Sequence, residues 1–246
     1  MSNARHRSLT VPVNGNGTRR DVPPVSRDEP PAGTDWLLLQ LADSAFPTGG
    51  FAHSSGLEAA WQHGEIRNRA ELNSFIEASL HQFGRGSLPF MTASLKRTDN
   101  LANLDELCHA FLSNHVANRA SRLQGQAMLA SARRIFRRPA LDTMAMPHGH
   151  LAPGFGAVTG ALGVEVDAAA GLFLFTHLRG LVASAVRLGI VGPMEAQALQ
   201  HESAELSDRI LQRCLPLTVD EVAQTTSLQE IWQGAQDRLY SRLFQS

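Results

Sequence analysis

The chain has 246 residues, of which 43% are hydrophobic and 18% charged, and its formal net charge is −1 at pH 7. This balance argues against nucleic-acid and anionic-membrane binding, which need a concentrated basic face. The two cysteines, Cys108 and Cys214, exclude a disulfide framework and a paired-cysteine zinc site, and they fit a reducing compartment. We therefore expect a cytoplasmic protein with no nucleic-acid or membrane partner.

Residues 1–34 differ from the rest of the chain. They contain Asn-Gly repeats and two Pro-Pro pairs but almost no large apolar side chains. Such a segment cannot bury enough surface to offset the entropy cost of ordering. We predict a disordered tail over 1–34 and a folded domain over 35–246.

From Trp36 onward the hydrophobic spacing is helical. Apolar residues recur at i, i+3, i+4 and i+7, and no segment alternates as a strand would. This pattern predicts an all-α, compact bundle of roughly seven to ten helices. The clearest helical segments are 36–41, 71–83, 104–115, 117–136, 167–188 and one running from Pro193 to about Cys214. Segment 167–188 is apolar nearly all round, and we judge it too short and too interrupted for a membrane span, so it is the predicted central helix.

The first distinctive stretch runs from Asp43 to Glu58. Its Pro-Thr-Gly-Gly turn ends one helix, and Ser54 or Ser55 can cap the next, with Glu58 in the first turn. No phosphate-binding glycine motif is present, so a structural turn is favoured over a nucleotide site. The loop can still form a docking surface, for which the candidate residues are Pro47, Gly49, Gly50, Phe51, His53 and Glu58.

Two further stretches lie in the middle of the chain. Arg119 and Arg122 share one helix face and can pair with acids of this chain or of a partner, while Gly125 indicates close approach of another helix. His148 and His150 can supply imidazoles to nickel or zinc, but two ligands make an incomplete site. The alternative is that they are loop histidines flanking a helix start. The Gly/Ala run over 155–163 predicts a thin helix for tight backbone packing.

The chain ends in a cluster of large side chains: Tyr240, Arg242, Leu243 and Phe244. Such residues dominate protein interfaces, although packing onto this domain's own core is an equal alternative. The sequence contains no recognisable nucleophile, metalloprotease or P-loop motif. We therefore expect an interaction protein that is not an enzyme and has no tightly bound cofactor.

Together these stretches resemble the UreF family of urease accessory proteins. The resemblance rests on the Asp-Ser-x-x-Pro-Thr-Gly-Gly-Phe-Ala-His-Ser-x-Gly-Leu-Glu signature, the Asn-Arg-Ala-Ser-Arg-x-Gln-Gly segment at Asn118–Gly125 and the terminal Ser-Arg-Leu-Phe-x-Ser. It covers about 35–246, and the residues of the first signature are similar to those of plant-type members.

This resemblance implies an all-α homodimer that binds UreD (also called UreH) and the GTPase UreG on the urease apoprotein. The resemblance further implies that nickel passes through this complex into urease. UreG hydrolyses GTP in that process, and this protein is a candidate to modulate the hydrolysis. By resemblance, the partner-binding residues are those of the 47–58 loop, Arg119 and the residues of the C-terminal cluster. The alternative is a metal-binding helical protein or small metalloenzyme centred on His148 and His150.

Overall fold

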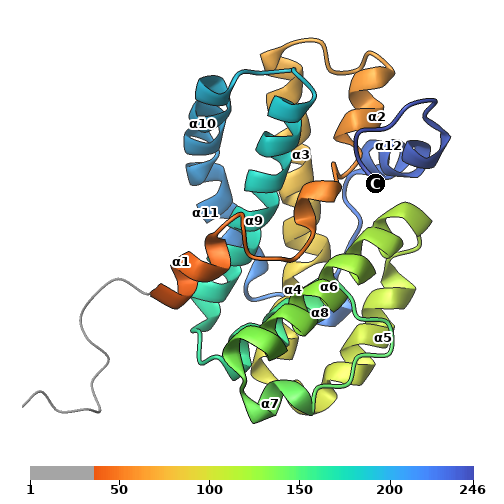
Figure 1. The fold of residues 1–246 in the computed structure, drawn as a ribbon. Coiled ribbons are helices and arrows are strands. Elements are labelled where there is room, and N and C mark those ends of the chain that lie inside the picture. The colour runs from red at the N-terminus through yellow and green to blue at the C-terminus, as the bar shows by residue number, and fades with distance from the viewer. Residues whose placement is uncertain (1–35) are drawn as a thin grey trace, which may run out of the picture. The chain divides into compact units, whose positions relative to one another are not determined.

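Helices make up all the regular structure between residues 36 and 246, the range that this computed structural model describes (Figure 1). The predicted all-α class is confirmed for that range, and the predicted tail over 1–34 lies outside it. The α-helices are α1 (Trp36–Ala42), α2 (Leu57–Gln62), α3 (Arg69–Gly86), α4 (Leu88–Lys96), α5 (Leu101–Phe111), α6 (His115–Phe136), α7 (Pro139–Asp142), α8 (Leu151–Ala161), α9 (Val166–Arg187), α10 (Pro193–Glu202), α11 (Ala204–Cys214) and α12 (Ser227–Ala235). Four 3-10 helices join them: η1 (Gly50–Ala52), η2 (Thr98–Asn100), η3 (Val219–Glu221) and η4 (Gln236–Arg238).

The described range thus has twelve α-helices, more than the predicted seven to ten. Two that the hydrophobic spacing did not predict, α2 and α7, have only six and four residues. Helices this short cannot display a recognisable apolar stripe, because a periodic pattern needs a window of about 11 residues or more.

Predicted and observed helix boundaries differ by a few residues in several places, and two differences have a clear physical cause. The helix expected over 104–115 ends at Phe111, because the Asn114 side chain accepts the backbone N–H groups of Val116 and Ala117 and begins α6 instead. The helix expected from Pro193 to Cys214 is divided at Ser203 into α10 and α11. The Ser203 hydroxyl donates to the Leu199 carbonyl at 2.8 Å, a contact that tends to bend helices.

The central helix is α9, as predicted. It contacts α3 and α4 and, on another side, α10, so that it lies between α3 and α10 in Figure 1. Contrary to the sequence argument, α9 is long and apolar enough to cross a membrane by length and composition, with a mean hydropathy of 1.5. However, 56% of that apolar window is buried against the rest of the protein, as in the core helix of a globular domain.

The closest backbone packing in the core involves the Gly/Ala run. A Cβ atom on Gly156 of α8 would collide with the Met91 carbonyl of α4, and one on Gly160 would lie 2.8 Å from the Leu95 carbonyl. The predicted thin helix is therefore confirmed. Gly125 is also a close approach, but its neighbour is the loop at Gly149 rather than another helix.

We expect Gly156→Ala to lower the free energy of unfolding by about 2 kcal/mol or more, because the new methyl group meets backbone that cannot rotate away. The matched control is Gly180→Ala in α9, where a Cβ has nothing within 4 Å. There the better helix propensity of Ala should raise stability by up to about 1 kcal/mol. Urea unfolding measures both, and equal stabilities for the two variants would contradict the tight α4–α8 contact.

Candidate interaction site

The signature stretch forms the loop between α1 and α2. Gly49 and Gly56 have φ of 72° and 86°, the left-handed region that glycine adopts without strain. A Cβ on Gly56 would also lie 2.9 Å from the backbone nitrogen of Gln233 in α12. The predicted serine cap is wrong, because the N-cap of α2 is Gly56 and has no side-chain cap hydrogen bond; the Ser54 hydroxyl still accepts the Glu58 N–H at 3.4 Å. Pro47 tethers the loop to α6, since its carbonyl accepts the Ser131 hydroxyl at 3.0 Å.

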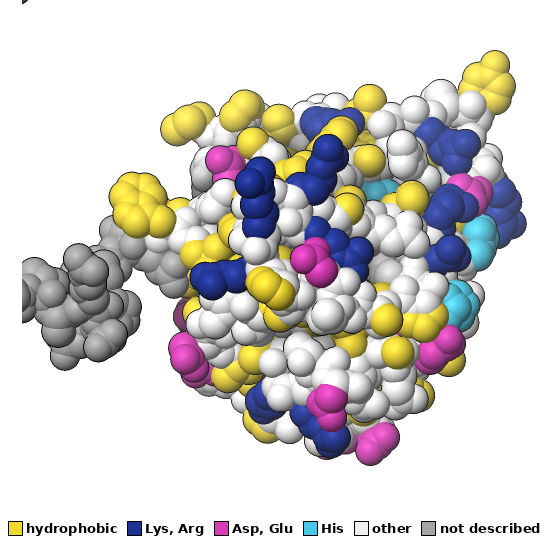
Figure 2. All heavy atoms as spheres, turned by 60° about the horizontal axis from the view of Figure 1, so that its bottom comes forward, with side chains coloured by type: hydrophobic (Ala, Val, Ile, Leu, Met, Phe, Trp, Pro, Cys, Tyr) yellow, Lys and Arg dark blue, Asp and Glu magenta, His cyan; other side chains and the backbone are white. Residues whose placement is uncertain are grey.

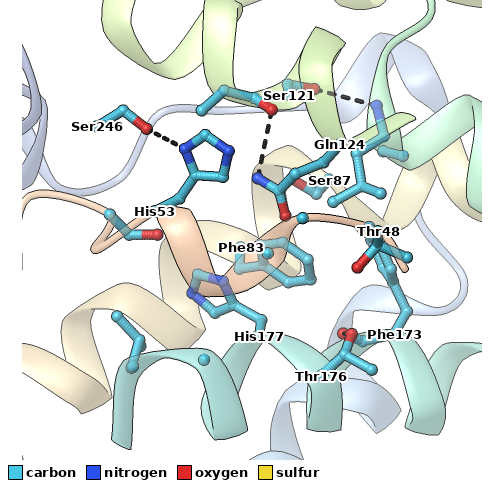
Figure 3. A pocket seen from close by; sticks show the side chains of 18 of the residues that line it. Thr48, His53, Phe83, Ser87, Ser121, Gln124, Phe173, Thr176, His177 and Ser246 are labelled. Atoms are coloured by element: carbon cyan, nitrogen blue, oxygen red, sulfur yellow. Dashed lines mark hydrogen bonds between the residues drawn. The ribbon is translucent and has the colours of Figure 1, made fainter. Parts of the chain in front are cut away.

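The last residues of the chain lie along this loop. The Gln245 N–H donates to the Ala52 carbonyl at 2.8 Å, and the Ser54 N–H donates to the Ser246 carbonyl at 2.5 Å. Beside them, His53 Nδ1 and the Ser246 hydroxyl are hydrogen-bonded (Figure 3). These last residues, which we call the tail from here on, and the signature loop are far apart in sequence. They nevertheless form one structural unit.

Glu58 joins the tail to α2 from inside. Its side chain is 1% exposed, and its carboxylate accepts the backbone N–H groups of Leu243 at 2.6 Å and Phe244 at 3.1 Å. The Gln236 amide donates to the same carboxylate at 2.6 Å. In this arrangement Glu58, named above as a docking residue, contacts the tail and not solvent. Glu58 can therefore contribute to a docking surface only indirectly, by holding the tail in place.

Asp237 joins the tail to α6 on the surface. Its carboxylate contacts Arg119 at 2.8 Å, Arg242 at 3.0 Å and His115 at 3.3 Å. The hydrogen bond from Arg119 is the largest cause that lowers the pKa of Asp237. Because these groups are exposed, each ion pair adds little stability by itself. The two candidate arginines thus meet through a residue that sequence reasoning missed.

The tail both packs inward and faces outward. Phe244 is 3% exposed, with the Arg187 guanidinium 4.2 Å above its ring. Tyr240 is fully exposed and Leu243 is half exposed, as is the candidate loop residue Phe51 at 76%. Packing onto this domain's own core is therefore confirmed for Phe244, and an interface role stays a prediction for the exposed residues of the cluster.

Behind the loop and the tail lies a cavity of about 570 Å³. Figure 3 shows His53 and Ser246 on one side of it and Phe83, Phe173 and His177 on another. The His177 ring stacks on Phe83 with 4.1 Å between centroids, and its Nε2 is 2.9 Å from the Ser79 hydroxyl. Burial lowers the pKa of His177 to about 4, so the ring is neutral at pH 7.

Sequence reasoning missed His177 as a lining residue. Its position as a polar residue within the apolar segment 167–188 was the one signal available.

Comparison with known proteins shows which family the chain belongs to. The UreF family model matches residues 66–204, more than half of the chain. This chain belongs to the UreF family. The family is one of urease accessory proteins rather than enzymes.

Individual relatives cover most of the chain. It is 37% identical to urease accessory protein F of Oryza sativa subsp. indica over 85% of this chain and 84% of the relative. It is 36% identical to urease accessory protein F of Arabidopsis thaliana, over 85% of this chain and 91% of the relative. It is 29% identical to urease accessory protein UreF of Mesorhizobium japonicum, over 89% of this chain and 99% of the relative. The higher identity to the two plant relatives agrees with the plant-type wording of the signature.

The two histidines singled out as metal candidates lie before α8 in this UreF-family chain. The buried Asp105 carboxylate accepts the backbone N–H groups of His148, Gly149 and His150 at 2.6–2.9 Å. This contact fixes the loop that Gly125 approaches. The loop histidines therefore have a structural role at the start of α8.

Their rings form a cluster with His109. His150 is fully buried, and its two ring nitrogens lie 3.1 Å from His109 Nδ1 and 3.1 Å from the Ser121 hydroxyl. His148 stacks on His109 and is 2.9 Å from Glu106. Within 36–246 no group of three His, Cys, Asp or Glu residues is arranged to hold a metal ion. The metal role of His148 and His150 stays a prediction.

We expect Glu58→Gln to loosen the tail, because a neutral amide cannot accept both backbone N–H groups and the Gln236 amide. An unsatisfied buried donor costs about 1–3 kcal/mol, so the Leu243 and Phe244 amides should exchange hydrogen at least about tenfold faster. Exchange followed by NMR or mass spectrometry measures this. Glu77→Gln, at an exposed position on α3, is the control and should leave the tail unchanged. Unchanged tail exchange in Glu58→Gln would refute the tether.

We expect stability to fall as the pH drops from 6.5 to 4. Burial is the largest cause that lowers the pKa of His53, His150 and His177 from 6.5 to about 4. In this window the unfolded chain binds more protons than the folded chain, so each histidine removes about 1.4 kcal/mol per pH unit. Urea unfolding across this range should show that His177→Phe lowers the pH slope by about one proton. A variant slope equal to that of the unmodified protein would show that His177 is already charged or exposed.

Proposed function

We propose that this chain is a urease maturation scaffold without catalysis of its own. It would bind UreD (UreH) and the GTPase UreG on the urease apoprotein for nickel insertion, and it would act in the cytoplasm. Membership of the UreF family supports a urease accessory role, since the plant relatives carry the name urease accessory protein F. Nickel is then cargo of the assembled complex, and no tightly bound cofactor is needed in this chain.

The observation that carries the proposal is the tail surface. Glu58 and Asp237 hold the last residues in a defined position, while Tyr240 and Leu243 stay exposed. On α12 nearby, Leu228 and Ile231 are 67% and 58% exposed. Ordered, exposed aromatic and aliphatic side chains beside arginines are typical of protein interfaces. This surface is the proposed contact for the accessory partners.

A homodimer is the second part of the proposal. On α9, Phe175 is 36% exposed and borders a groove formed with α10 and α11, where Leu174, Leu178 and Leu211 also lie. Met194, at the start of α10, is 85% exposed. An apolar groove next to exposed apolar side chains supports pairing with a second copy, because burying this surface is favourable. Sedimentation equilibrium of the purified chain tests it.

We expect Arg242→Ala to fold normally and to weaken assembly of the complex with UreD and UreG from the same source by about tenfold. Folding is preserved because Arg242 is exposed and Asp237 keeps its contact with Arg119. A pull-down with titrated partner measures assembly, and circular dichroism confirms the fold. Arg209→Ala, which removes an exposed pair with Glu205 on α11, is the matched control.

Two outcomes count against the proposal. If the unmodified protein forms no ternary complex, the scaffold function is wrong. If Arg242→Ala and the unmodified protein assemble equally, the tail has no part in it.

A further inference from the structure

Positive charge is segregated in one part of the chain. Residues 107–141 contain no Asp or Glu but six arginines, although the whole chain has nearly equal numbers of basic and acidic residues, 22 and 23. Most of these residues lie in α6 and directly after it. The tail surface does not explain this separation of charge, because Asp237 of that surface pairs with only one of the six arginines, Arg119.

The fold places these arginines along one side of α6. At about 100° per residue, Arg119, Arg122, Arg133 and Arg134 fall within about a third of the circumference of α6. The opposite side carries Met128 and Ala132, which are buried in the core. The distance along the axis from Arg122 to Arg134 is about 18 Å, at about 1.5 Å per residue, and Arg137 and Arg138 follow directly after the helix ends.

Some of these arginines are already used. Arg119 pairs with Asp237, and Arg133 donates to the Leu141 and Met144 carbonyls at 3.0 and 2.8 Å. In the described part of the chain, no ion pair or side-chain hydrogen bond is found for the remaining four, which are all exposed: Arg122, Arg134, Arg137 and Arg138. We call these four residues the α6 basic strip.

A protein partner fits this strip better than a nucleic acid does. Leu123 lies on the same side of α6 and is 46% exposed, so the surface mixes guanidinium groups with an aliphatic side chain. The face in Figure 2 has Lys and Arg side chains spread over it, with hydrophobic and some acidic side chains among them. Arginine binds carboxylates through paired hydrogen bonds and is enriched in protein interfaces. Four charges in a protein of net charge −1 fall short of the basic surface that nucleic acids require.

We propose that the α6 basic strip is a second docking surface that binds an acidic surface of a partner protein in the urease maturation complex. This inference rests on the proposed scaffold function and adds a contact that the tail surface does not provide. The two surfaces adjoin, because Arg119 on the same side of α6 contacts Asp237 and the Gln245 carbonyl of the tail. A single partner protein with an acidic surface can therefore engage both surfaces.

The test compares two triple charge reversals of equal size. The strip variant carries Arg134→Glu, Arg137→Glu and Arg138→Glu. The control carries Arg97→Glu, Arg209→Glu and Arg213→Glu, which are exposed positions on other elements. A milder strip variant, with Gln in place of Glu at the same three positions, covers the case in which the reversal impairs folding. Affinity for the complex of UreD, UreG and urease apoprotein is measured at low and at physiological salt.

We expect the strip reversal to weaken binding at least about tenfold at low salt and to flatten its salt dependence, with less than about a twofold effect in the control. The Gln variant should lie between them. Equal binding by the strip and control variants would overturn the strip proposal while the scaffold function stands. No binding by the unmodified protein would overturn the scaffold function, and the strip proposal with it. Binding of duplex DNA by the unmodified protein at physiological salt, lost in the strip variant, would show that the strip is a nucleic-acid surface and would also overturn the proposal.

Discussion

The arrangement at the proposed interface depends on one buried carboxylate. Glu58 is almost fully enclosed, and two consecutive backbone N–H groups of the tail and the amide side chains of Gln236 and Gln62 donate to it. A buried carboxylate is costly unless hydrogen bonds satisfy it, so the tail and the helix α2 need each other. With that bond made, Phe244 is directed into the core, and Tyr240 and Leu243 remain outside.

A second buried carboxylate accepts hydrogen bonds from backbone N–H groups at the start of α8. Asp105 accepts three successive backbone N–H groups, and this holds the loop against which Gly125 packs. From there α8 runs so close to α4 that only glycine fits at Gly156. The two acids and the glycines thus determine where the loop, the tail and the cavity wall lie. A scaffold needs such fixed positions, because a preorganised surface loses less entropy on binding.

Much of the fold could be predicted from the sequence, but the roles of individual site residues could not. Helical periodicity gave the class, the central helix α9 and the tight packing of the Gly/Ala run. It failed where helices are short, as at α2, and where a single polar side chain divides a helical pattern, as at Asn114 and Ser203. In the site, the loop and the tail were recognised as distinctive segments. Their contact through Glu58 and the contribution of Asp237 were not, because long-range pairing leaves no periodic trace.

By itself the sequence determined the helical class, the segregation of charge along 107–141 and, through short motifs, the resemblance to the UreF family. These are local properties, set by the spacing and type of residues close together in the chain. Only the tertiary structure decided which of the distinctive side chains are buried and which are exposed. Burial depends on what lies opposite a residue in space, and for Glu58 that is a backbone segment about 185 residues away along the chain.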